Sequence, residues 1–211
     1  MKTTQVTGFQ QFLNGLEDQL SDLPFPNQLA FAASCCERVF TNYVCFAKEG
    51  RWGDPSILRS AIDKTWEVVL GRSYALAEIR ELENQCRMVT PSSDNFPEID
   101  VAAGQEAAFM VTLLLQFCYD KKTRYAVRIA TFARDTIDMY IQVHEKLAPS
   151  DPNREQKIAN HPLMQKELDR QKSDLVTLRG VRAAGELSNF RLQTTITESN
   201  IGVKDSGGAC T

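Results

Sequence analysis

The sequence predicts an all-α protein, a compact single-domain bundle of about seven helices. Apolar residues recur at helical spacing along most of the 211 residues, and no run of alternating apolar and polar residues is followed by a hairpin turn. The composition, 43% hydrophobic and 24% charged, fits one soluble globular domain with a sizeable core. We expect this domain to span residues 1–203, and residues 204–211, KDSGGACT, to form a flexible tail.

The first two predicted helices span residues 8–20 and 26–48. Phenylalanine and leucine residues share one face of the first, at the i, i+3, i+4 spacing of an amphipathic helix. The sequence LPFP at residues 23–26 ends it, because proline disfavours helix in the residue before it. The second helix is apolar over most of its circumference, so we expect other elements to pack on several of its sides.

The next three predicted helices span residues 55–69, 76–89 and 100–119. Asp54 and Pro55 form a good N-cap and first-turn pair for the first of them, and the second ends before Pro91. Residues 91–100, PSSDNFPEID, are typical of a loop because proline, serine and aspartate favour turns. The third begins with small residues, so we expect neighbouring helices to approach closely at its start.

The last two predicted helices span residues 123–147 and 162–180. The first carries an apolar face of alanine, isoleucine and tyrosine side chains. The second has a narrow seam at 4-3-4-3 spacing with charged residues elsewhere, as in a coiled coil. This seam consists of Met164, Leu168, Gln171, Leu175 and Leu178. The helix either covers the core as an outer helix or pairs with a second copy, and regularity fades beyond Gly180 and Gly185.

Several classes of function find no support in the sequence. The net charge of −3 provides no cationic surface for nucleic acid. The longest apolar stretch, residues 107–115, is far shorter than the roughly 20 residues that span a bilayer, so we expect no membrane association. No secretory signal is visible and the six cysteines form no C-x-x-C pair, which favours a cytoplasmic protein with mostly buried thiols.

Motifs for catalysis are also missing from the sequence. The chain has two histidines, His144 and His161, and no Glu-x-x-His motif of a di-iron bundle. It has neither the G-x-S-x-G turn of a hydrolase nor a glycine-rich phosphate loop. We therefore expect no metal and no cofactor, and the sequence favours a protein without enzymatic activity while leaving that question open.

Two adjacent charges interrupt the otherwise apolar second helix. Glu37 and Arg38 are the only charged residues between Gln28 and Lys48. A buried unpaired charge costs several kcal/mol, so each needs a partner from another segment. The candidate partners are Arg59, Asp63, Glu67, Arg134, Asp135 and Asp138. The charges form either a buried ion network or a polar pocket, in which an arginine would grip a carboxylate or phosphate.

The sequence around these charges resembles a known family. CCERVFTNY at residues 35–43 is similar to the CER-x-x-PNY signature of the bacterial YjaG-like family, the domain-of-unknown-function family 416, with Thr41 in place of the usual proline. WGD at residues 52–54, Trp66 and ESNIG at residues 198–202 follow in the order of that family. The resemblance implies an all-helical cytoplasmic protein of this length and implies no particular activity.

We weigh two hypotheses for the function. The first is a self-associating or protein-interaction module without catalytic activity, which fits the missing motifs and the narrow seam of the last helix. The second is a protein or enzyme that binds a small polar or anionic ligand in a pocket built by both ends of the chain. The candidate ligand-binding residues are Glu37, Arg38, Asn42, Tyr43, Glu198, Ser199 and Asn200.

Overall fold

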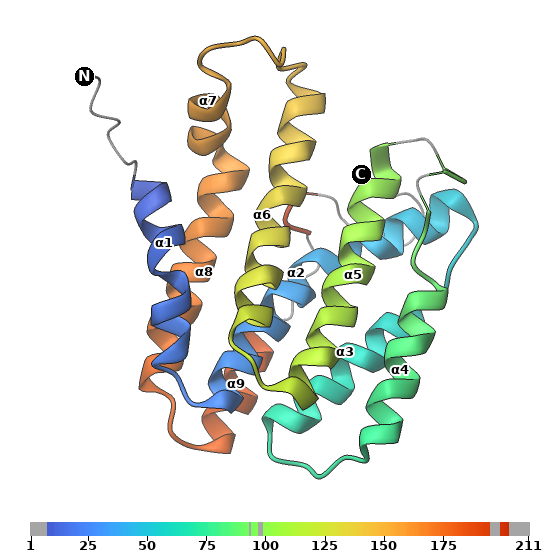
Figure 1. Ribbon diagram of the computed structural model, residues 1–211, viewed down its shortest axis with the longest axis vertical. Coiled ribbons are helices and arrows are strands. Elements are labelled where there is room, and N and C mark those ends of the chain that lie inside the picture. Colours follow the sequence, from blue (N-terminus) through green and yellow to red (C-terminus); the bar gives the residue numbers. More distant parts are fainter. Residues whose placement is uncertain (1–7, 93, 97–98, 195–198, 203–211) are drawn as a thin grey trace.

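The computed structural model describes residues 8–92, 94–96, 99–194 and 199–202, without the side chains of residues 8–14 and 99–100. In these ranges the protein is all-helical and has no strand (Figure 1). The described helices are α1 (Gly8–Ser21), α2 (Phe25–Gly50), α3 (Pro55–Val69), α4 (Leu76–Met88), α5 (Ile99–Asp120), α6 (Arg124–His144), α7 (Arg154–Asn160), α8 (Pro162–Gly180) and α9 (Ala184–Thr194). The predicted tail at 204–211 lies outside the described residues.

The expected number of about seven helices is too low, because the described residues contain nine. Helix α7 was missed because its seven residues are too few for an apolar period, and only Ile158 in it is buried. Helix α9 was missed because it begins beside Gly185 and contains few apolar residues. Its described buried residues are Leu187, Phe190 and Thr194.

Helix α2 occupies the centre of the bundle, as its apolar circumference predicts. It packs against α3, α5, α6, α8 and α9 (Figure 1). The start of α5 comes close to it, because Gly104 lies where an added Cβ atom would stand 2.8 Å from the Cβ and Cγ atoms of Phe46. The small residues at the start of α5 therefore allow the close approach that the sequence predicts.

Helix α5 is long and apolar enough to cross a membrane by length and composition alone. Most of it is buried inside the described bundle, where it contacts α2, α3, α4 and α6. Helix α5 is therefore buried as a core helix, as the sequence predicts.

Helix α8 lies along α2 and α6 as an outer helix. All five residues of its predicted seam are buried within one chain. The alternative use of this seam, pairing with a second copy, would require these side chains to leave the core. The seam of α8 therefore belongs to the interior, which is the first of the two alternatives that the sequence predicts.

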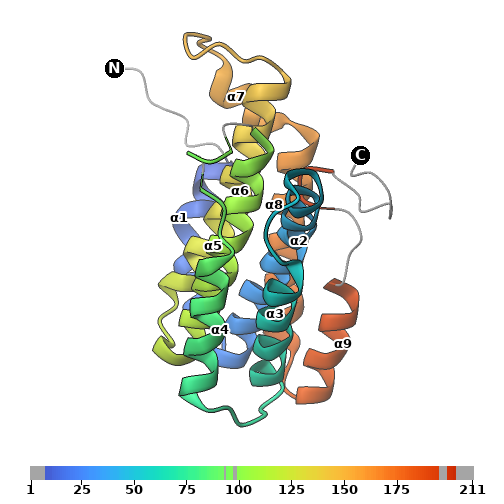
Figure 2. The same cartoon turned by 90° about the vertical axis from the view of Figure 1, so that its right-hand side faces the viewer.

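Helix α9 covers α2 and α3 on the side that faces away from α5 and α6 (Figure 2). The ring of Phe190 lies 6.3 Å from that of Trp66, which is fully buried in α3. After α9, residues 195–198 lie outside the described part, and the chain continues at Ser199 against α2. Asn200 thus returns to the central helix α2, whereas α1 packs against α6.

The close approach of α2 and α5 provides a stability test at Gly104. Glycine to alanine usually stabilises a helix, but the Gly104→Ala methyl group would displace Phe46, so we expect a loss of about 1–3 kcal/mol. The matched control is Gly180→Ala at the end of α8, where nothing lies within 4 Å and stability should hold or rise. Urea unfolding followed by circular dichroism measures both, and equal shifts would contradict the packing argument.

Candidate functional site

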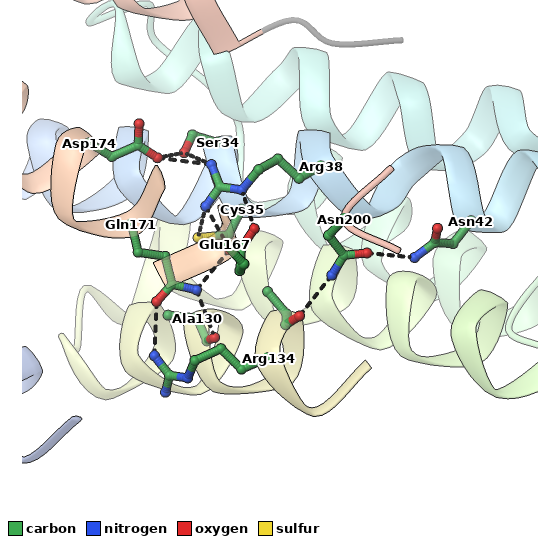
Figure 3. A network of polar contacts seen from close by, with 11 residues as sticks. Ser34, Cys35, Arg38, Asn42, Ala130, Arg134, Glu167, Gln171, Asp174 and Asn200 are labelled. Carbon is green, nitrogen blue, oxygen red and sulfur yellow. Dashed lines mark hydrogen bonds and ion pairs between the residues drawn. The ribbon is translucent and has the colours of Figure 1, made fainter. Parts of the chain in front are cut away.

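Arg38 lies at the centre of a buried polar network, and all five of its N–H groups have acceptors (Figure 3). Its Nε and Nη2 atoms donate to the two carboxylate oxygens of Glu167, at 2.9 and 3.0 Å. Its Nη1 atom donates to Asp174 and to Ser34, both at 2.9 Å, and Nη2 also contacts Cys35 Sγ at 3.1 Å. No donor of this guanidinium remains for a ligand.

The acceptors of Arg38 are held in place by further hydrogen bonds. Gln171 donates to Glu167 at 2.8 Å and to the Ala130 carbonyl at 3.1 Å, and its own oxygen accepts from Arg134 at 2.8 Å (Figure 3). Ser34 donates to Asp174 at 2.5 Å. The network therefore joins α2, α6 and α8, and Gln171 is the polar interruption that the sequence shows in the seam of α8.

Glu37 points to a different side of α2 and has its own partners. Arg59 of α3 binds both of its oxygens, at 2.7 and 2.9 Å, and the indole of Trp66 donates to Oε1 at 2.9 Å. Arg59 also pairs with Asp63 at 3.0 Å, and Asp63 in turn pairs with Arg191 of α9. A chain of alternating charges thus runs from the centre of the bundle to its surface.

Asn42 and Asn200 join α2 to the segment after α9. Asn42 Nδ2 donates to Asn200 Oδ1 at 3.0 Å, and the backbone N–H of Asn200 donates to the Arg38 carbonyl at 2.9 Å (Figure 3). Ser199 and Asn200 are both buried. Asn200 therefore contacts α2 as the sequence predicts, Ser199 is buried beside it, and Glu198 lies outside the described part of the chain.

Tyr43 links α2 to the residue that follows α4. Its hydroxyl donates to the Val89 carbonyl at 2.6 Å, and burial raises its pKa to about 12. Gly53 has a φ of +86°, and an added Cβ atom there would lie 2.5 Å from the Tyr43 hydroxyl oxygen. The glycine of the WGD sequence is thus required by this tyrosine, and Asp54 caps α3 by accepting from Ser56 N at 2.9 Å.

The electrostatics of the network suit a fixed charge more than a reactive group. Burial lowers the pKa of Arg38, but the carboxylates of Glu167 and Asp174 raise it well above its ordinary value. Burial raises the pKa of Cys35 to about 12, so this thiol is a poor nucleophile. Burial lowers the pKa of Arg134, which binds a neutral glutamine instead of a carboxylate.

Only some of the predicted partners of Glu37 and Arg38 make direct contact. Arg59 pairs with Glu37, whereas Glu67 pairs with Lys64 and Arg72. Glu167 and Asp174 were not among the predicted partners, because charges on an amphipathic helix are expected to face solvent. Their signal is the spacing of Glu167, Gln171 and Asp174, which places three polar side chains on the same face of α8.

Glu106 of α5 is a titratable residue that the sequence analysis did not single out. Its carboxylate accepts from the Thr136 hydroxyl of α6 at 2.5 Å. Burial is the main cause that raises its pKa from 4.5 to about 7, and the nearby charge of Asp135 adds to the shift. Among the described contacts, this carboxyl group has no ion-pair partner.

The family model for "Protein of unknown function (DUF416)" matches residues 15–204. The chain belongs to the DUF416 family. Two similar DUF416 relatives are the uncharacterized proteins YjaG of Escherichia coli K12, 23% identical, and of Salmonella typhimurium, 22% identical. Each alignment covers 81% of this chain and 90% of the relative.

A DUF416 protein from Shewanella baltica has a similar crystal structure. The two structures superpose with a TM-score of 0.82 over 90% of this chain and 99% of the other, at 22% sequence identity. At that identity the likeness establishes the fold alone. Within this chain, the charged signature residues Glu37 and Arg38 bind side chains of α3 and α8, and Asn42 binds Asn200.

The Arg38 network generates a prediction about stability. Arg38→Met would leave Glu167 and Asp174 buried without their cation, so we expect a loss of about 3–5 kcal/mol in the free energy of unfolding. The control is Arg72→Met, which removes an exposed pair with Glu67 and should cost less than about 1 kcal/mol. Unchanged urea unfolding of Arg38→Met would instead favour a ligand site.

Glu106 generates a prediction about pH. Its pKa is raised in the folded protein, so the folded state holds this proton more tightly and its stability falls as pH rises from 4.5 to about 7. Glu106→Gln keeps an acceptor for Thr136 and should remove on the order of 2 kcal/mol of that fall, allowing for partial solvent screening. Thermal unfolding at several pH values compares the two proteins, and parallel curves would refute the prediction.

Proposed function

We propose that this protein is a helical interaction module without catalytic activity that associates with a second copy of itself. The observation that carries the proposal is that the polar groups of Glu37 and Arg38 bind partners within the chain. A charged pocket needs hydrogen-bonding capacity that its own residues do not use, and the Arg38 guanidinium has none. Glu37 and Arg38 therefore stabilise the fold, and we assign the recognition of a second copy to the surface of the bundle.

The surface that best fits this role is the end of the bundle where α2 and α4 finish. The rings of Phe46, Trp52 and Phe96 lie 5.4 to 6.1 Å apart, and Trp52 is 37% exposed. Met88 is 74% exposed and precedes Val89, whose carbonyl binds Tyr43 beside the turn after Trp52. Phe46 is buried beneath this surface, and we call Trp52, Phe96 and the neighbouring Met88 the aromatic end. Tryptophan and methionine are enriched at protein interfaces.

Native mass spectrometry and sedimentation of the wild-type chain test this proposal. We expect a dimer, and Met88→Lys should weaken it by about tenfold because a charge would be buried at the interface. Leu192→Lys on α9 is the matched control, since Leu192 is also 74% exposed and lies away from the aromatic end. A chain that stays monomeric at all concentrations would refute the proposal.

A second candidate function is the binding of a small polar ligand, and one atom favours it. Asn42 Oδ1 is buried and has no hydrogen-bond partner among the described residues. Native mass spectrometry also tests this alternative, because a retained molecule would add a defined mass. Loss of that mass in a folded Asn42→Ala variant would replace the interaction proposal with the ligand-binding one.

A further inference from the structure

Residues 199–202 are held against the bundle in the way that a domain holds a bound peptide. They form a short turn outside any helix, closed by a hydrogen bond of 3.1 Å from Gly202 N to the Ser199 carbonyl. They lie after α9 in the chain and contact elements far from them in sequence. The contacts of this segment therefore form a small set that is separate from the contacts between the helices.

Asn200 is recognised by three hydrogen bonds of different kinds. Its backbone N–H donates to the Arg38 carbonyl at 2.9 Å, and its Nδ2 atom donates to the Ala133 carbonyl at 2.7 Å. Its Oδ1 atom accepts from Asn42 Nδ2 at 3.0 Å (Figure 3). An aspartate at this position would lose the donor to Ala133 and place two acceptors together, so the contacts select an asparagine side chain.

Ile201 provides the apolar half of the recognition. It is buried in a second apolar cluster, which is separate from the main core of the bundle. The other buried members of this cluster are Ile137, Ile141, Ile158, Met164 and Leu168. The surface of α2, α6 and α8 beneath residues 200 and 201 thus combines polar contacts for an asparagine with apolar side chains for the isoleucine that follows it. We call this contact surface the groove, and its apolar part the apolar pocket.

We propose that this groove is a binding site for an Asn-Ile peptide segment, filled by residues 199–202 of the same chain and open to the same segment of a second copy. The second copy is the occupant because its segment carries the chemistry already seen in the groove. Local opening of a short turn with few contacts costs less than global unfolding, so the segment can leave while α2, α6 and α8 stay folded. This inference goes beyond the proposed function and uses a surface distinct from the aromatic end.

Competition within the chain determines how the site behaves. A tethered segment has an effective concentration on the order of millimolar, so it excludes a free peptide at lower concentration. Weakening the tethered segment should therefore uncover the site. The full chain carrying Asn200→Ala and Ile201→Ala keeps Asn42, the Arg38 carbonyl and the apolar pocket.

The test is fluorescence anisotropy with a labelled synthetic peptide of residues 196–204, ITESNIGVK. We expect the double variant to bind this peptide with a Kd about tenfold lower than the wild-type chain does. A control peptide with aspartate in place of the asparagine should bind the double variant about tenfold more weakly. Circular dichroism establishes that the variant is folded, and Ile201→Ala alone replaces it if the double variant unfolds.

Two results would overturn the inference. One is a folded variant that does not bind the peptide at about 1 mM, and the other is equal binding by the variant and the wild-type chain. Neither result bears on the aromatic end, because the peptide probe has no part in that contact. Loss of dimer in Met88→Lys with normal peptide binding would separate the two surfaces.

Discussion

The burial of one guanidinium group determines much of this structure. Arg38 projects from the central helix into a region without solvent, and such a charge is tolerated only with strong, well-placed acceptors. Glu167 and Asp174 supply these acceptors from a single face of α8, one on each side of Gln171. The position of α8 along α2 and α6 is therefore specified by polar geometry, and its apolar seam alone would permit several registers.

The remaining signature residues extend this arrangement to both ends of the chain. Glu37 connects α2 to α3 through Arg59 and Trp66. Asn42 connects α2 to the segment after α9, and Tyr43 holds the end of α4 against the turn that contains Gly53. Four positions between 37 and 43 of one helix thus connect it to α3, to α8, to the end of α4 and to Asn200, which gives a physical reason for the signature of this family.

The sequence was sufficient for the parts of this picture that depend on local patterns. Apolar periodicity located the long helices, and the rarity of charge in α2 identified Glu37 and Arg38 as buried residues that require partners. Arg59 was one of six candidate partners, and it is the one that binds Glu37 directly. Glu167 and Asp174 could not be identified in this way, because their carboxylates lie 129 and 136 residues from Arg38 in the chain. Local periodicity contains no information about such contacts.

The distance in sequence between Arg38 and its acceptors also has a consequence for synthesis of the protein. Chains are made from the N-terminus at roughly 5–20 residues per second, so α2 leaves the ribosome well before α8 exists. During that interval the guanidinium has no carboxylate from α8 to neutralise it, and water is its best partner. The guanidinium therefore keeps its water until α8 has been synthesised, and this part of the core closes late.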